Sequence, residues 1–280
     1  MATEEMIGER IRLRVSDDGV ADVRLYRADK MNALDVAMFQ ALIDTGEKLC
    51  AMPNVRAVVI SGEGRAFCAG LDTSRFGQMA DSPKSSGPVA GSMSKDITVR
   101  THGWSNAAQH ACMVWTQVPV PVIAAVHGVC FGGGLQIASG ADIRVVAPDA
   151  RLAVMEMKWG IIPDMGGYLL WRGLVRGDVL RELTFTAREF SGEEAARLGF
   201  ATLVDSDPLA RAMAIAEDIA TRNPHAIRAA KALFNRHHDM APDDILMEES
   251  VIQQRLIASR NQMEAVMSQM QKRPPDYVDP

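Results

Sequence analysis

Two almost wholly apolar segments, at residues 56–61 and 120–126, most constrain the fold of this chain. A strand with one face in water alternates apolar and polar residues, whereas a strand covered on both faces is apolar throughout, as in a parallel sheet between helices. A helical pattern at residues 36–52, with Asp35 as its expected N-cap, precedes the first of them. Further strands are predicted at residues 11–15, 20–26, 143–147 and 151–154. This alternation predicts an α/β fold.

Helical patterns replace strands from about residue 207 onward. Asp207-Pro208 and Asn223-Pro224 each place a capping residue before a proline that starts a helix. We therefore expect a core at residues 1–206 and a helical region at residues 207–280. Within the latter, residues 243–270 carry an apolar stripe that packs either on the chain's own core or against another subunit. A subunit interface is favoured, because a tail beyond the main domain has little of its own to pack against.

Charge and cysteine content exclude several functional classes. The formal net charge is −5, and no block of Lys and Arg marks a nucleic-acid footprint, so we expect small-molecule partners and neither nucleic acid nor membrane. The cysteines lack the CxxC spacing that is typical of a metal site. We therefore expect four buried free thiols, as in the reducing environment of the cytoplasm. The cysteines are Cys50, Cys68, Cys112 and Cys130. The first five residues form no basic or apolar leader, which supports the cytoplasmic prediction.

Two glycine-bearing turns each follow one of the apolar strands: FCAGLD at residues 67–72 and FGGGLQ at residues 131–136. Each turn can direct a bare backbone N–H group at one oxygen, and two such donors form an oxyanion hole. The glycine triplet at residues 132–134 could instead allow the backbone to pack closely against its neighbours. A phosphate loop is disfavoured, because the terminal Lys-Ser/Thr of that motif is missing. The pair of turns favours the oxyanion hole.

Four segments, at residues 25–34, 65–72, 121–142 and 160–167, carry a family resemblance that extends over nearly the whole chain. In order, they resemble the early strand-turn-helix, the first oxyanion turn, the central strand with its glycine triplet, and the loop after the second catalytic position of the crotonase, or enoyl-CoA hydratase/isomerase, superfamily. The resemblance implies a crotonase-like spiral of ββα repeats with a helical C-terminal trimerisation region. It also implies a homotrimer, or a hexamer made of two trimers.

The resemblance further implies an acyl-CoA thioester as substrate, with no cofactor besides the CoA that the substrate itself carries and no metal. By position, the oxyanion amides fall on Leu71 and Gly133. The residues that fall on the CoA-binding surface are Ala28, Lys30, Ala33, Ala69, Gly70, Asp72 and Gly134.

The carboxylate pattern departs from that of the family's hydratases, which hold and activate water with two glutamates. Here the first position is Gln136 and the second is Glu156. An amide can hold water or substrate, but it cannot accept and return a proton at neutral pH. Asp164, eight residues after Glu156, gives a spacing that resembles the dienoyl-CoA isomerases. We therefore expect a double-bond isomerase acting on a dienoyl- or 3-enoyl-CoA through an enolate.

Other interpretations of the same residues stay open. The enzyme could be a 2-enoyl-CoA hydratase, a non-catalytic acyl-CoA binder, or a thioester hydrolase or dehalogenase with Asp164 as nucleophile. Asp164 could instead cap the turn at residues 165–167, and Glu156 could be a solvated charge at a strand end. His127, Trp115 and Trp159 are expected to pack structurally, although the two tryptophans could instead wall the acyl pocket. The interval at residues 74–101 is either a lid or a plain insertion.

Overall fold

The computed structural model describes residues 3–72 and 96–280. In this part of the chain, a main sheet has the strand order β1-β2-β3-β4-β5-β7-β10. The first three strands pair antiparallel, and β3, β4, β5, β7 and β10 run parallel. The strand bounds are β1 Thr3–Ile7, β2 Ile11–Val15, β3 Val20–Leu25, β4 Ala57–Gly62, β5 Val122–Val126, β7 Ile143–Val146 and β10 Leu203–Val204. The α/β prediction is confirmed.

A smaller sheet lies beside the main one and gives the chain its spiral course. It contains β6 (Val129–Phe131), β8 (Arg151–Ala153) and β9 (Phe190–Ser191). Two single parallel bridges, Leu34 to Leu71 and Cys68 to Cys130, continue the same pairing toward the N-terminus. Each main-sheet strand from β3 to β5 is therefore followed by a short extended piece and then a helix. This is the expected ββα repeat. It places the short extended segments that follow β3, β4 and β5 next to one another.

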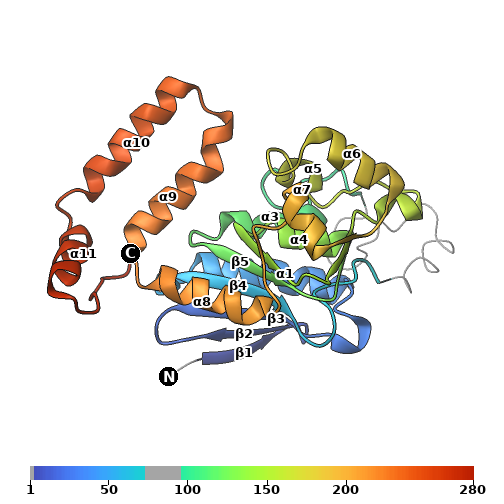
Figure 1. Cartoon of the computed structure of the whole chain (residues 1–280), viewed down its shortest axis with the longest axis horizontal. Helices are drawn as coiled ribbons and strands as arrows, with labels where there is room; N and C mark the ends of the chain where they lie inside the picture. Colours follow the sequence, from blue (N-terminus) through green and yellow to red (C-terminus); the bar gives the residue numbers. More distant parts are fainter. Residues whose placement is uncertain (1–2, 73–95) are drawn as a thin grey trace.

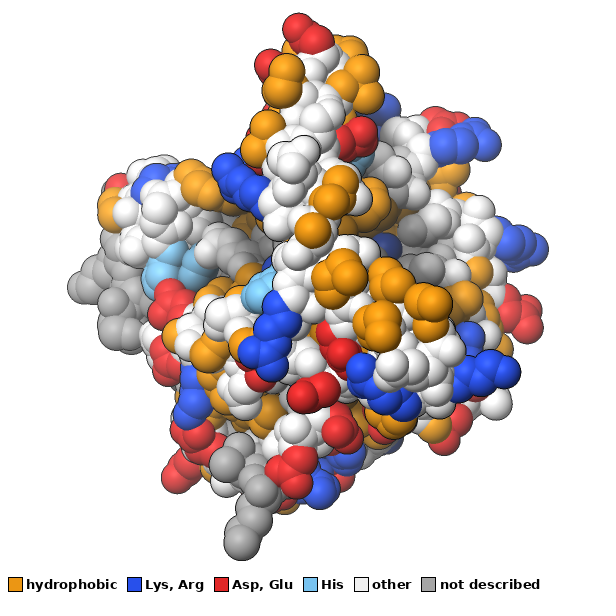
Figure 2. All heavy atoms as spheres, turned by 90° about the vertical axis from the view of Figure 1, so that its left-hand side faces the viewer, with side chains coloured by type: hydrophobic (Ala, Val, Ile, Leu, Met, Phe, Trp, Pro, Cys, Tyr) orange, Lys and Arg blue, Asp and Glu red, His pale blue; other side chains and the backbone are white. Residues whose placement is uncertain are grey.

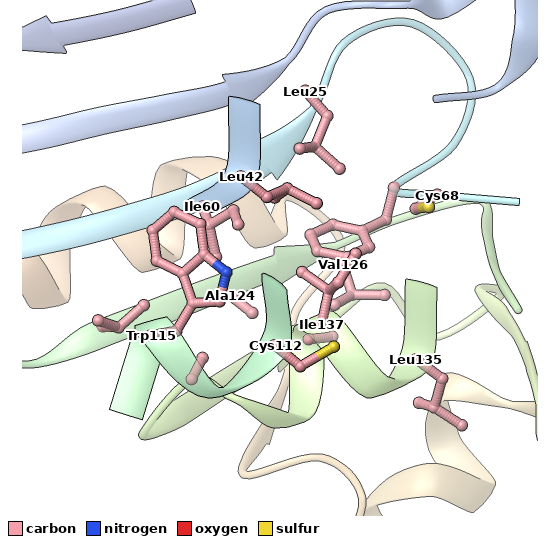
Figure 3. Close-up of a cluster of buried hydrophobic side chains, with 14 of the residues drawn as sticks. Leu25, Leu42, Ile60, Cys68, Cys112, Trp115, Ala124, Val126, Leu135 and Ile137 are labelled. Carbon is pink, nitrogen blue, oxygen red and sulfur yellow. The ribbon is translucent and has the colours of Figure 1, made fainter. Parts of the chain in front are cut away.

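Helices cover both faces of the parallel strands, which explains why these strands are apolar throughout. Along β4, Val58 and Ile60 belong to the core beneath α1 (Val36–Cys50) and α3 (Ala107–Gln117), whereas Val59 joins the core beneath α8 (Pro208–Ala220). Figure 1 shows α8 lying along the sheet, and Figure 3 shows side chains of the larger core. The sheet residues Leu25, Ile60, Ala124 and Val126 lie there with Leu42 of α1 and with Cys112 and Trp115 of α3.

The predicted helix caps form as expected because they depend on local chemistry. The Asp35 side chain accepts from the Met38 N–H at 2.8 Å, which starts α1 at its predicted first residue. Asp207 and Asn223 accept in the same way at the starts of α8 and α9 (Pro224–Arg236). The other α-helices of the described residues are α4 Gly133–Ser139, α5 Gly167–Leu170, α6 Gly177–Thr186, α7 Gly192–Leu198, α10 Pro242–Leu256 and α11 Arg260–Gln271.

Helices α9, α10 and α11 form an arm that extends away from the sheet (Figure 1). Its base is held by Lys231, whose ammonium donates to Asp142 at 2.7 Å, and by Arg228, which donates to the carbonyls of Pro53 and Val55. Residues 243–270, for which an apolar stripe was predicted, span most of α10 and α11. Figure 2 faces the arm and shows hydrophobic side chains on its surface. The exposed ones include Phe234, Leu246, Met247, Ile257, Met263 and Met270.

Some expectations need correction or lie outside the described residues. The predicted boundary at residue 207 assigns α8 to the helical region, yet Ala212 and Ala216 of α8 are part of the core on the sheet. All four cysteines are free, but Cys50 is exposed, because it ends α1 where the helix leaves the core. Trp115 is buried as predicted. Most of the proposed lid at residues 74–101 falls at 73–95, outside the described residues.

Candidate active site

The two predicted oxyanion turns lie side by side. Cys68 donates to the Val129 carbonyl at 3.0 Å, and Phe131 donates back to the Cys68 carbonyl at 3.0 Å. Leu34 in turn donates to the Gly70 carbonyl at 2.8 Å. Three pieces far apart in the sequence thus run together at one end of the parallel strands. The sequence predicted both turns, and the sheet register brings them together.

The N–H groups of Leu71 and Gly133 have no hydrogen-bond acceptor within residues 3–72 and 96–280. Around Leu71, the backbone bonds made by the Gly70 carbonyl and the Asp72 N–H both go to Leu34. Because successive N–H groups of extended chain point to opposite sides, the Leu71 N–H faces away from Leu34. Gly133 is the first residue of α4, where a helix has no internal acceptor for its N–H groups. These two donors are the pair expected for an oxyanion hole.

A cleft of about 730 Å³ opens beside both turns. The predicted site residues that line it are Lys30, Ala33, Ala69, Gly70, Leu71, Asp72, Gly133 and Glu156. Four others do not line it. Ala28 is exposed in the short 3-10 helix Ala28–Lys30, and Gly134 is buried against Cys68. Gln136 is buried and bonded to Glu156, and Asp164 lines a separate cavity.

Positive charge is available at the rim of the cleft. Lys30 and Lys158 both line it, and neither forms an ion pair with another described residue. Arg151 also lines it, but its guanidinium is engaged by Glu189 at 2.7 Å. Lys158 was not predicted as a site residue from the sequence, although it lies two residues after Glu156. Trp159 was expected to pack in the core, but its side chain is 47% exposed and lines the cleft. The 3-10 turn Glu156–Trp159 buries its first residue, Glu156, and leaves its last two residues at the surface.

Glu156 is a buried acidic group beside the second oxyanion turn. It is only 7% exposed, so the solvated strand-end alternative is wrong. Its carboxylate lies so close to Gly132 that a β-carbon on that glycine would be 3.2 Å from Oε1. Its Oε2 is buried and has no partner among the described residues. Burial, together with the negative charge of Asp164, raises the pKa of Glu156.

Gln136 is fully buried and uses its side-chain amide within the protein. Its Nε2 donates to Glu156 Oε1 at 2.7 Å. Its Oε1 accepts from the N–H groups of Met165 at 3.0 Å and of Gly167 at 2.9 Å. The expected role of Gln136 in holding water or substrate would require it to share or break these bonds.

Asp164 lines a separate cavity of about 240 Å³, which shares no lining residue with the cleft. Arg100, Trp104, Met113 and Tyr168 also line this cavity. Burial raises the pKa of the Asp164 carboxyl. Asp164 does not cap α5, whose N-cap is Gly166 and whose turn N–H groups go to Gln136 instead.

Two residues that the sequence analysis did not single out, Asn32 and Arg27, hold the segments around the cleft together. Asn32 is fully buried at φ +55, and its side-chain Nδ2 donates to the carbonyls of Glu63 and Ala66. Arg27 forms an ion pair with Asp72 at 2.8 Å and donates to the Ala33 carbonyl at 2.9 Å. Asp72 therefore anchors the end of the first oxyanion turn. His127 is half-buried and bonded through Nε2 to the Gly64 carbonyl, a structural role as expected.

No cluster of three or more His, Cys, Asp or Glu side chains suited to a metal ion occurs in the described part of the chain. Nor does any described helix have the length and apolar character needed to cross a membrane. The site thus brings together two backbone donors, a buried carboxylate with one oxygen that has no partner among the described residues, and a second, half-buried carboxylate whose charge raises the pKa of the first.

Comparison with known proteins agrees with this geometry. Residues 16–280 match the family model described as enoyl-CoA hydratase/isomerase. The chain is 30% identical to a peroxisomal Delta(3,5)-Delta(2,4)-dienoyl-CoA isomerase of Arabidopsis thaliana, over 94% of each chain. It is also 30% identical to echA6 of Mycobacterium tuberculosis, named a probable enoyl-CoA hydratase, over 93% of this chain and 96% of that one. An enoyl-CoA hydratase/isomerase structure from Mycobacterium abscessus superposes with a TM-score of 0.85 at 27% identity, covering 96% of this chain and 100% of that one. The chain therefore belongs to the enoyl-CoA hydratase/isomerase family, within the crotonase superfamily.

Proposed function

We propose that this enzyme shifts a double bond in an unsaturated acyl-CoA thioester, with a 3,5-dienoyl- or 3-enoyl-CoA as substrate. The observation that carries the proposal is the carboxylate arrangement around the oxyanion turns. Glu156 offers one buried, unpartnered oxygen, and Gln136 occupies its other oxygen without being able to carry a proton. An isomerisation needs proton removal and return, but no added water.

The reaction divides into two proton transfers. Ionised Glu156 takes a proton from the α-carbon, and the C–H electron pair moves into the thioester to form an enolate. The N–H groups of Leu71 and Gly133 stabilise the enolate oxygen, a contribution typically worth about 10²–10³ in rate per donor. Protonated Asp164 then delivers a proton to the distant carbon, and the double bonds settle into conjugation. Glu156 finally loses its proton to solvent and Asp164 regains one.

The direction of the two pKa shifts supports proton transfer by both carboxyl groups, and their positions assign each group to its step. Burial raises the pKa of both carboxyl groups, which brings each closer to the pH at which it can gain and lose a proton. Glu156 lies beside Gly132, next to the oxyanion donor of Gly133, and so is assigned to the α-carbon. Asp164 lines a separate cavity, yet lies close enough for its charge to act on Glu156, and is assigned to the remote end of the acyl chain.

Hydration of a 2-enoyl-CoA is the second candidate, favoured by the hydratase name of the mycobacterial relative. One carboxylate would then have to activate water and supply a proton alone. A non-catalytic acyl-CoA binder is disfavoured by the buried Glu156 Oε2, because an unpartnered buried carboxylate oxygen costs stability and gives a binder nothing in return.

Incubation with 3-enoyl-, 3,5-dienoyl- and 2-enoyl-CoA in separate reactions tests the proposal. Absorbance follows conjugation, and mass spectrometry detects addition of water. We expect conjugation of at least one of the first two substrates without a gain in mass. Water addition to 2-enoyl-CoA as the dominant reaction would favour the hydratase, and turnover of none of the three would contradict both.

We also infer that the arm formed by α9, α10 and α11 packs against other copies of the chain, as expected for a trimer or a hexamer. Its exposed hydrophobic side chains support this assembly (Figure 2). A cytoplasmic location stays a prediction, since one of the relatives is a peroxisomal protein.

A further inference from the structure

Gln136 connects the two acid-bearing segments of the site. Its Nε2 bonds to Glu156 at 2.7 Å, and its Oε1 bonds to the backbone on the C-terminal side of Asp164, at Met165 and Gly167. We propose that Gln136 is a positioning residue that leaves only Oε2 of Glu156 free for proton exchange and holds the Asp164 turn in a fixed relation to it. The proposal rests on the isomerase function above.

The chemistry of its partners fixes the orientation of the Gln136 amide. Backbone N–H groups can only donate, so the atom facing Met165 and Gly167 must be the amide oxygen. The NH₂ group then necessarily faces Glu156, where it donates to an acceptor. A rotated amide would place NH₂ against two donors and oxygen against a carboxylate. The network therefore has one arrangement, and Glu156 Oε1 is committed to it.

Burial makes this arrangement rigid. Gln136 is completely buried within α4, one turn after Gly133, so it shares a helix with the second oxyanion donor. The same short helix thus positions the amide that stabilises the enolate and the amide that orients the base. Small displacements of catalytic groups cost much of the rate, which is why such a residue can matter without touching the substrate.

A glutamate at position 136 would change the balance of charge. It could still accept from Met165 and Gly167, but its second oxygen would face Glu156 Oε1. Two carboxylates at that separation cannot both be ionised without strong repulsion, and they would share a proton. The amide avoids this conflict, and Glu156 stays free to act as the base.

Infrared difference spectroscopy tests the proposal without relying on turnover. The carboxyl band lost in Glu156→Gln identifies Glu156, and its titration is compared between wild type, Gln136→Met and Gln136→Glu. Because the amide N–H stabilises the ionised form, both variants are expected to raise the pKa of Glu156. Gln40→Met is the matched control, since it removes a glutamine bond of 2.8 Å to Asp44 at the surface of α1.

Kinetics supply the second readout. If the wild-type enzyme is active, Gln136→Met should lower kcat about tenfold and change KM little. It should also move the rising limb of the pH profile to higher pH, because the pKa of Glu156 rises. An unmoved Glu156 titration in both variants would overturn the positioning role, even if the enzyme proves to be an isomerase. An inactive wild type whose Glu156 titration does shift in the variants would leave the role of Gln136 standing and reject the proposed function alone. Should Gln136→Met fail to fold, Gln136→Glu decides by the same titration.

Discussion

Gly70 lies so close to Phe131 that a β-carbon on Gly70 would be 2.7 Å from the Phe131 carbonyl oxygen. Gly70 also has a φ of +83, a conformation that L side chains rarely adopt. The contact joins the first oxyanion turn to the residue just before the glycine triplet of the second. The separation of the two donors, Leu71 and Gly133, therefore depends on the lack of a side chain at position 70.

Replacing Gly70 by alanine should destabilise the protein by about 3 kcal/mol, through backbone strain and the clash with Phe131, and should abolish turnover. Thermal unfolding and the isomerase assay measure the two effects. Gly103→Ala is the control, because Gly103 also has a positive φ, of +59, but a β-carbon there would meet no atom of the described residues within 4 Å. Equal losses in both variants would show that strain alone, and not the contact with Phe131, is responsible.

Variants of the two carboxylate residues are expected to block different steps of the reaction. In deuterated water, Glu156→Gln should lose both isomerisation and exchange of the α-proton, by about 10²–10⁴ in rate. Asp164→Asn should keep α-proton exchange and lose isomerisation, because the enolate still forms but is not protonated at its far end. Mass spectrometry of the recovered thioester follows the exchange. If Asp164→Asn isomerised at the wild-type rate, Asp164 would have no part in the reaction.

The ionised carboxylate of Glu156 should destabilise the folded protein at neutral pH. Its pKa is raised in the folded state, above the ordinary value of 4.5, so the folded protein binds more protons than the unfolded chain between these two values. The contribution of Glu156 to the free energy of unfolding therefore falls as the pH rises from 4.5 through the pKa of Glu156 in the folded protein. Removing the charge reverses the penalty.

Glu156→Gln should accordingly raise the melting temperature by a few degrees at pH 7, with a smaller gain at pH 4. Glu217→Gln, at an exposed position on α8, should change the melting temperature little at either pH. A gain for Glu156→Gln that is the same at both pH values would mean that the charge of Glu156 is not its source.

Lys30 is expected to contribute to CoA binding by charge. It lines the cleft near the oxyanion turns, and the phosphates of CoA would provide its partners. Lys30→Ala should raise KM for the acyl-CoA about tenfold and leave kcat nearly unchanged. The effect should shrink at high salt, where screening weakens the attraction. Lys48→Ala is the control, because Lys48 lies on α1 and pairs with Glu5. A fall in kcat with KM unchanged would place Lys30 in another role.

The features that sequence predicted well are those set by neighbours along the chain. Asp35 caps α1 through Met38, three residues away, and the apolar run of β4 follows from burial on two faces. The strand β1 was missed because Glu4 and Glu5 interrupt its apolar pattern, and α6 was missed because it buries only Leu183 and Thr184. In such segments, pairing and packing with distant residues determine the structure.

The candidate site divides in the same way. The oxyanion turns were predicted, because glycine and the strands before it are local signals. The partners of Gln136 were not, because Glu156 and Gly167 lie 20 and 31 residues further along the chain. The exposure of Trp159 and the separation of Asp164 from the cleft depend on how the segment at residues 156–167 folds over α4.

The arm should give this chain its oligomeric state. Leu246 and Met247 on α10 are 64% and 65% exposed, and burying large apolar side chains of this kind is what stabilises a subunit interface. Light scattering after size-exclusion chromatography should give the mass of a trimer or a hexamer of the 30.5-kDa chain. The double variant Leu246→Asp and Met247→Asp should shift this mass toward the monomer, because each buried unpaired carboxylate would oppose association. Met6→Asp, which adds the same charge on β1 outside the arm, is the control and should keep the assembly intact. A monomeric wild type, or an assembly that survives the double variant unchanged, would show that the apolar surface of α10 does not join subunits.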